Sequence, residues 1–143
     1  GTQITGQFDA RNDGPAASPV YNISTTEFNV GDESTADYTF DASWGQGFET
    51  SDPTDDIFDV SGIVTGEDKE NAKDFTADVI QPLHYVTACP DYIEKGILDI
   101  QLVGDTTVSG FIVDFIDSDG CNNLFQVSVD CEGSPISFTY PMN

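Results

Sequence analysis

The stretch "GILDIQLVGDTTVSGFIVDFIDSDGCNNLFQVSVD", residues 96–130, contains three short runs in which apolar and polar residues alternate. The apolar positions are Leu98, Ile100 and Leu102, then Phe111, Val113 and Phe115, then Phe125, Val127 and Val129. Because successive side chains of a strand point to opposite faces of its sheet, a period of two predicts half-buried antiparallel strands. Gly104-Asp105 and Asp119-Gly120 separate the runs and are typical turn residues. The segment therefore predicts a β-meander.

The same period recurs in "DYTFDASW" (37–44), "FTADV" (75–79) and "PISFTY" (135–140), with Gly- and Asp-rich turns between the runs. Only residues 65–75, "TGEDKENAKDF", offer room for a helical turn, and a solvated loop is preferred there because they lack an apolar stripe. We expect a single all-β domain over residues 1–143. Its predicted architecture is an antiparallel two-sheet β-sandwich, immunoglobulin-like or related, of about nine strands. The predicted inward side chains are Tyr38, Phe40, Phe75, Leu98, Ile100, Phe111, Val113, Phe115, Phe125, Val127 and Phe138.

Charge dominates the composition. Four Lys and Arg against 26 Asp and Glu give a formal net charge of −22. Such a chain repels nucleic acids and anionic membrane surfaces, so neither is an expected partner. No run approaches the roughly 20 apolar residues that a membrane helix needs. We expect a secreted or cell-surface protein, because three Cys in a small acidic chain fit an oxidising compartment.

The meander also predicts the disulfide. Tracing strands 82–88, 96–103, 108–116 and 124–130 in alternating directions brings Cys89 and Cys121 to one end of the sheet. Cys131 falls at the other end, roughly 30 Å of extended chain from Cys121. A disulfide needs Cα atoms within about 7 Å. The expected bond is therefore Cys89–Cys121, with Cys131 left as an inert small residue or an intermolecular thiol.

Three segments carry a resemblance: "DDIFDVSGIV" (55–64), "QPLHYVTACPDYIEKGILDI" (81–100) and "VDFIDSDGCNNLFQVSV" (113–129). Together they resemble a recurrent pattern in uncharacterised secreted proteins and lipoproteins of Bacteroidota. The chain departs from it in two places, since Asp117-Ser118-Asp119-Gly120 stands where the family often has Gly-Asp-Gly, and Cys131 has no counterpart. The resemblance implies an extracellular or surface β-domain and no particular activity.

Two acidic segments contain ligand types that calcium prefers, namely carboxylate and amide oxygens. The first offers Asp114, Asp117, Asp119 and Asn122, and the second is "DPTDD" at 52–56. The first lacks the later Glu of an EF-hand and lies between strands rather than helices. A solvated acidic turn explains both segments and is preferred, with calcium kept as the alternative, so we expect no obligatory cofactor.

Catalysis and glycan binding have less support. His84 is the one histidine of the chain, and no nucleophile elbow accompanies it. Pairs of carboxylates are expected by chance among so many acids, so they do not indicate a hydrolase. Trp44 and Phe48 lie near two glycines, as in an exposed sugar-binding loop, but Trp44 also continues the inward register of Tyr38 and Phe40.

We therefore expect a non-enzymatic structural protein, secreted or at the cell surface. Its predicted role is a self-assembling subunit of an extracellular filament or surface layer, or an adhesive module, joined as a homo-oligomer or polymer through strand edges. The segment before Pro15 is the predicted donor strand. The alternative is a carbohydrate- or calcium-binding surface module.

Overall fold

The computed structural model describes residues 4–30, 34–69, 73–89, 93–104, 108–116, 121, 124–131 and 134–141. These residues form nine β-strands and no helix. The strands are β1 (Ile4–Asn12), β2 (Val20–Val30), β3 (Ser34–Gln46), β4 (Ile57–Asp68), β5 (Lys73–Val86), β6 (Ile93–Val103), β7 (Gly110–Phe115), β8 (Leu124–Cys131) and β9 (Ser134–Pro141). In this part of the chain, no helix is long and apolar enough to cross a membrane.

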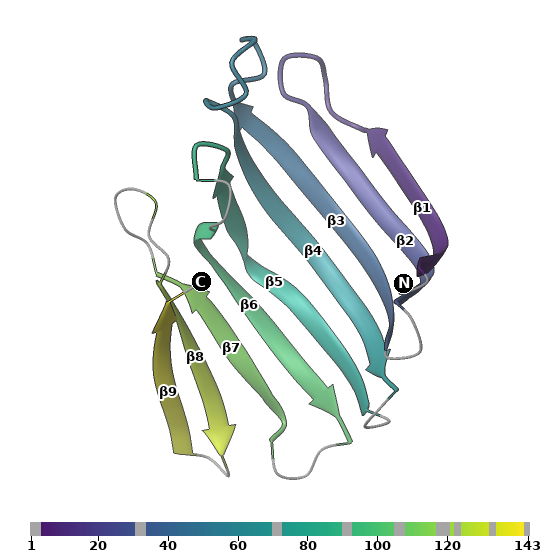
Figure 1. Ribbon diagram of the computed structural model, residues 1–143, viewed down its shortest axis with the longest axis vertical. Coiled ribbons are helices and arrows are strands. Elements are labelled where there is room, and N and C mark those ends of the chain that lie inside the picture. Colours follow the sequence, from purple (N-terminus) through teal and green to yellow (C-terminus); the bar gives the residue numbers. More distant parts are fainter. Residues whose placement is uncertain are drawn as a thin grey trace.

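All nine strands belong to one open antiparallel sheet, and they follow one another in chain order from β1 to β9 (Figure 1). Each strand pairs with its neighbours in sequence, so β1 and β9 lie at opposite edges. The predicted meander of residues 96–130 is confirmed as β6, β7 and β8. It is part of a meander that runs through the whole chain.

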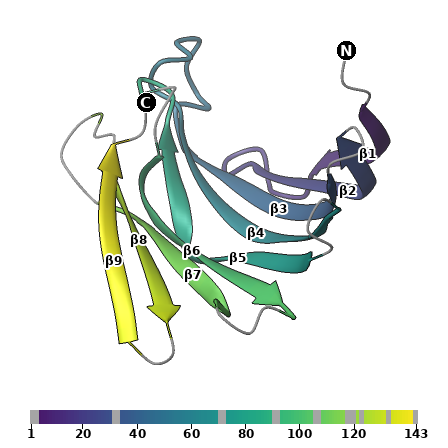
Figure 2. The same cartoon turned by 60° about the horizontal axis from the view of Figure 1, so that its bottom comes forward.

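The sheet curves across its width, with β1 and β2 at one side and β8 and β9 at the other (Figure 2). Bulges accompany this curvature, because an extra residue in one strand bends it and increases its twist. Gly62 and Gly96 lie at two register shifts, with φ angles of +145° and +133° that favour glycine. Pro82 occupies an exposed position in β5 at the same shift as Gly96, where a proline disturbs no regular ladder.

The period-two pattern correctly predicts which side chains share a face. Residues paired directly across antiparallel strands point to the same side of the sheet. One such row joins Tyr38, Val64, Ala77, Ile100, Phe111, Val129 and Ile136 from β3 to β9. Neighbouring rows hold the remaining predicted inward residues. We call this side of the sheet the apolar face.

Burial does not follow the prediction, and the two-sheet sandwich is not confirmed by the described residues. The described residues make one sheet, so no second layer covers the apolar face. Among them, the buried hydrophobic side chains are Ala36, Val79 and Cys89, whereas Phe138 is 48% exposed. The reason is physical: alternation shows that a strand has one apolar side, and it does not reveal what lies against that side.

Two local expectations also change. Residues 65–68 and 73–75, which we expected in a solvated loop, continue β4 and β5 as paired strands. The runs 75–79 and 82–86 belong to one strand, β5, which is interrupted by register shifts at Gln81. The strand ends shortly before Cys89, so the direction of the predicted trace holds.

A disulfide joins Cys89 to Cys121, the pair expected from the trace, with Cα atoms 5.4 Å apart. It links the segment after β5 to the segment before β8, across β6 and β7. Cys89 is 4% exposed, and its backbone N–H donates to the Val86 carbonyl at 2.8 Å. The side chain of Cys131 lies outside the described residues, so its predicted free state stays a prediction.

Candidate functional site

The two faces of the sheet differ sharply in chemistry. The face opposite the apolar face carries acids in every strand from β3 to β7. With β1 included, its described charged side chains are Asp9, Arg11, Asp37, Asp41, Asp59, Glu67, Asp74, Asp78, Lys95, Asp99 and Asp114. We call it the acidic face. It holds nine of the chain's 26 acids.

Aromatic side chains pack against one another on the apolar face. Trp44 stacks on Phe58 with ring centroids 5.4 Å apart, and Phe125 stacks on Tyr140 at 5.9 Å. Phe28 meets Tyr38 edge to face at 5.6 Å. Such contacts add about 0.5–1.5 kcal/mol each beyond area burial, so they support the sheet without a second layer. They also place Trp44 in the apolar register, as the inward interpretation predicted.

Between these aromatic groups the apolar face is hollowed. The hollow has a volume of about 550 Å³. Its lining residues are Asp68, Lys73, Phe75, Ala77, Ile100, Leu102 and Phe111, from β4 to β7. Beside it, β9 presents Ile136, Phe138 and Tyr140 at 46–48% exposure, a row that we call the β9 ridge. Hollow and ridge thus lie on the same face.

Both outer strands offer one unpaired edge within the described sheet. Every residue of β1 is exposed, including Ile4 at 62% and Phe8 at 68%. Every residue of β9 is exposed as well. Pro135 and Pro141 lie near the two ends of β9, where they limit the backbone groups available for pairing. The free edge of β9 is therefore framed between two prolines.

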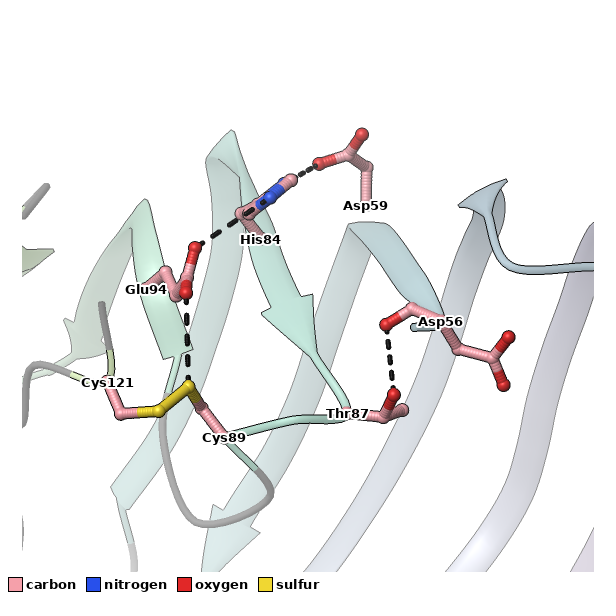
Figure 3. A network of polar contacts seen from close by, with 7 residues as sticks. All are labelled: Asp56, Asp59, His84, Thr87, Cys89, Glu94 and Cys121. Carbon is pink, nitrogen blue, oxygen red and sulfur yellow. Dashed lines mark hydrogen bonds and ion pairs between the residues drawn. A yellow bond between two sulfur atoms is a disulfide. The ribbon is translucent and has the colours of Figure 1, made fainter. Parts of the chain in front are cut away.

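His84 lies between carboxylates from two neighbouring strands (Figure 3). Its Nδ1 is 2.8 Å from Oδ1 of Asp59 in β4, and its Nε2 is 4.0 Å from Oε2 of Glu94 in β6. The other Glu94 oxygen lies 4.0 Å from the Cys89 sulfur. These described contacts tie β4, β5 and β6 together beside the disulfide. The set combines an imidazole with two carboxylates and includes no Ser, Thr or Cys side chain.

The calcium candidate at the β7–β8 turn is described only in part. Asp114 belongs to β7 and lies on the acidic face, opposite Ile97 and Gln126. Asp117, Asp119 and Asn122 lie outside the described residues, so the set stays a prediction. Within the part of the chain that the structure covers, no group of three or more His, Cys, Asp or Glu side chains is arranged to hold a metal.

In the second calcium candidate, residues 52–56, the acids bond to local groups. The Thr54 hydroxyl donates to Asp52 Oδ1 at 2.7 Å and the Thr54 backbone N–H donates to the same oxygen at 2.9 Å, and these bonds lower the pKa of Asp52. The Thr50 hydroxyl donates to Asp55 at 2.9 Å. Asp56 accepts the Trp44 indole N–H at 3.1 Å. The geometry is that of a self-bonded turn.

Sequence reasoning missed the two features that distinguish this molecule. The uncovered apolar face has no local signal, because a covered face gives the same alternation. The contact between His84 and Asp59 depends on the register of β4 against β5, which shifts at bulges. Comparison of the chain with protein-family models, with curated proteins and with solved structures finds no match.

Proposed function

We propose that this chain is a non-enzymatic structural subunit, secreted or displayed at the cell surface, that assembles into a filament or surface layer through its strand edges. The observation that carries this proposal is the single open sheet, whose edge strands β1 and β9 are each paired on one side within the described residues. An exposed edge strand is a template for another strand.

The two edges differ, and the difference favours an open chain of subunits. Pairing β1 of one copy with β9 of the next is a heterologous contact, because it uses different surfaces of the two copies. Heterologous contacts continue indefinitely unless the rotation between copies closes a ring. Main-chain hydrogen bonds would provide affinity, as in strand addition. The sheet would then continue from copy to copy with its apolar and acidic faces aligned.

The extracellular part of the proposal rests on covalent chemistry and charge. A disulfide such as Cys89–Cys121 forms and persists in oxidising surroundings, outside the reducing cytosol. A net charge of −22 gives strong repulsion between copies at long range. Salt at extracellular levels screens this repulsion beyond a Debye length of about 8 Å. The Debye length in dilute buffer is much longer.

The non-enzymatic part rests on the surroundings of the chain's one histidine. The described polar contacts of His84 are with the carboxylates of Asp59 and Glu94, and not with a Ser, Thr or Cys side chain. The set lies on the strands of an open sheet. Acid–base catalysis of the usual kind needs such a group within hydrogen-bond reach of a bound substrate.

Light scattering and electron microscopy test assembly on the whole chain, from roughly 10 mM to 1 M NaCl, over which the Debye length falls from about 30 to 3 Å. We expect high-mass species that grow with salt, and a large loss of them when residues 1–13 are deleted. A variant with residues 1–13 replaced by Gly and Ser at equal length is the matched control and should behave like the deletion. A chain that stays monomeric throughout, with and without millimolar calcium, contradicts the proposal.

A further inference from the structure

The sheet exposes far more surface than a folded chain of its mass requires. A compact monomer of 15.4 kDa exposes roughly 7,200 Å². This chain exposes 8816 Å², an excess of roughly 1,600 Å² over that expectation. A stable interface buries roughly 800 Å² on each partner. The excess is therefore large enough to supply one complete interface. Among the described residues, five of the nine exposed large hydrophobic side chains lie on the apolar face, namely Ile4, Phe8, Ile136, Phe138 and Tyr140.

Charge selects the kind of partner. In β4 and β5 the apolar face carries the pair Asp68 and Lys73 at its end, opposite each other, while the paired acids in the interiors of strands β3 to β7 are on the other face. A basic partner would be attracted to the acidic face and would leave the apolar face in water. A second copy meeting this one face to face would turn both acidic faces outward, so no carboxylate row enters the contact.

Shape supports the same partner. In a two-fold dimer each surface must fit its own copy, so a projection and a recess are needed on one face. The apolar face has a recess, the hollow around Ala77, Ile100 and Phe111, and a row of exposed large side chains, the β9 ridge with Ile136 and Phe138, which we take as the projection. The ridge of each copy would enter the hollow of the other. Apart from Asp68 and Lys73 at the end of the hollow, the side chains on both sides are aliphatic and aromatic, as in the central part of stable interfaces.

We propose that the apolar face is a homodimer interface, on which two copies of this chain pack face to face as the two layers of a β-sandwich. The sandwich that the sequence predicts within one chain would then be completed between two chains. This contact is separate from edge pairing, because it uses side chains of one face rather than the backbone groups of β1 and β9.

A matched pair of variants on β9 tests it by sedimentation equilibrium in 0.15 M NaCl. Phe138 lies on the apolar face and Thr139 is next to it on the acidic face. Both changes put one negative charge on the same edge strand. Phe138→Asp should weaken dimerisation at least 100-fold, and Thr139→Asp should change it less than about threefold, since a buried unpaired charge is costly and an exposed one is not. Equal effects of the two variants, or a monomeric wild-type chain, overturn the proposal.

An uncharged variant covers the case in which Phe138→Asp fails to fold. Ala77 lines the hollow, and Ala77→Phe fills it. The monomer should keep its circular dichroism spectrum while dimerisation weakens at least tenfold. Retained dimerisation contradicts the ridge-in-hollow arrangement.

Trp44 fluorescence provides an independent test of dimerisation, because Trp44 is the one tryptophan of the chain and lies on the apolar face. Its emission should shift to the red on dilution through the dimer dissociation constant. A wild-type chain that stays monomeric yet shifts Trp44 emission to the blue on uncharged lipid vesicles would show that lipid covers the face, and would overturn the second copy as its partner. A wild-type chain that forms dimers but no filaments at any salt concentration contradicts only the edge proposal.

Discussion

Gly62 of β4 lies directly opposite Phe40 of β3, and the Phe40 ring occupies the space beside it. A Cβ on Gly62 would approach Cδ1 of Phe40 to 2.7 Å and would collide with the Thr39 carbonyl oxygen. Gly62 also has a φ of +145°, which residues with a Cβ rarely adopt. The position therefore excludes any side chain, on steric and conformational grounds together.

Gly62→Ala should destabilise the fold by more than about 1 kcal/mol, measured by urea unfolding. Gly45 in β3 is the matched control, because a Cβ there would meet only the Ile57 carbonyl oxygen, at 3.7 Å. Gly45→Ala should be neutral or stabilise by up to about 1 kcal/mol, through a less flexible unfolded chain. Similar losses for both variants would show that general strand effects, and not the contact with Phe40, set the cost.

Val113→Asp should destabilise the chain by roughly 2 kcal/mol or more, because it places a charge among the apolar side chains of β6 and β8. Val113 lies between Leu98 and Val127 on the apolar face. Ile112→Asp, one residue earlier on the acidic face, is the control and should cost clearly less. Thermal unfolding followed by circular dichroism compares the two. A larger loss for Ile112→Asp would mean that the faces are inverted.

Removing the disulfide should lower stability by about 3–4 kcal/mol in the chain-entropy model, because the bond closes a loop with a sequence separation of 32. Urea unfolding of Cys121→Ser measures this loss, and adding reductant to the wild-type chain should reproduce it. Peptide mapping without reductant should recover Cys89 joined to Cys121. A peptide joining Cys121 to Cys131 would contradict both the bond and the strand trace.

Asp78→Asn should stabilise the sheet. Asp78 of β5 lies directly opposite Asp99 of β6, and like charges in that position repel. The expected gain is roughly 0.2–1 kcal/mol in low salt and should shrink as salt rises. Asp9→Asn is the control, since Asp9 lies opposite Ser24. A gain that does not depend on salt would assign the effect to something other than charge.

His84 and Asp59 should couple weakly. Their contact of 2.8 Å joins β4 to β5 at the surface, with the Asp59 side chain 50% exposed. Exposed ion pairs contribute about 0.2–1 kcal/mol. A double-mutant cycle with His84→Ala and Asp59→Ala should give a coupling energy in that range near pH 6. A coupling of several kcal/mol would show that the pair contributes strongly to the pairing of β4 with β5.

Much of the fold was predictable because local chemistry repeats along the chain. Apolar residues at every second position of β6, β7 and β8 identify these strands and the side on which they are apolar. The turns between them fix alternating directions, and alternating directions bring Cys89 close to Cys121. The bulges were not predictable, because Gly62 and Gly96 cannot be told from other strand glycines until the register between neighbouring strands is known.

The sequence by itself determined the strands of the meander over residues 96–130, their apolar side, the disulfide pair and the excess of acid, since each depends on residue type and short-range spacing. Only the tertiary structure decided that all nine strands continue in one sheet, in which the described residues leave the apolar face uncovered and both edges open. The reason is that alternation specifies a side chain's direction, whereas the layer that meets it depends on how distant strands pair. The contacts of His84 with Asp59 and Glu94 arise in the same way, because registers between strands bring them together.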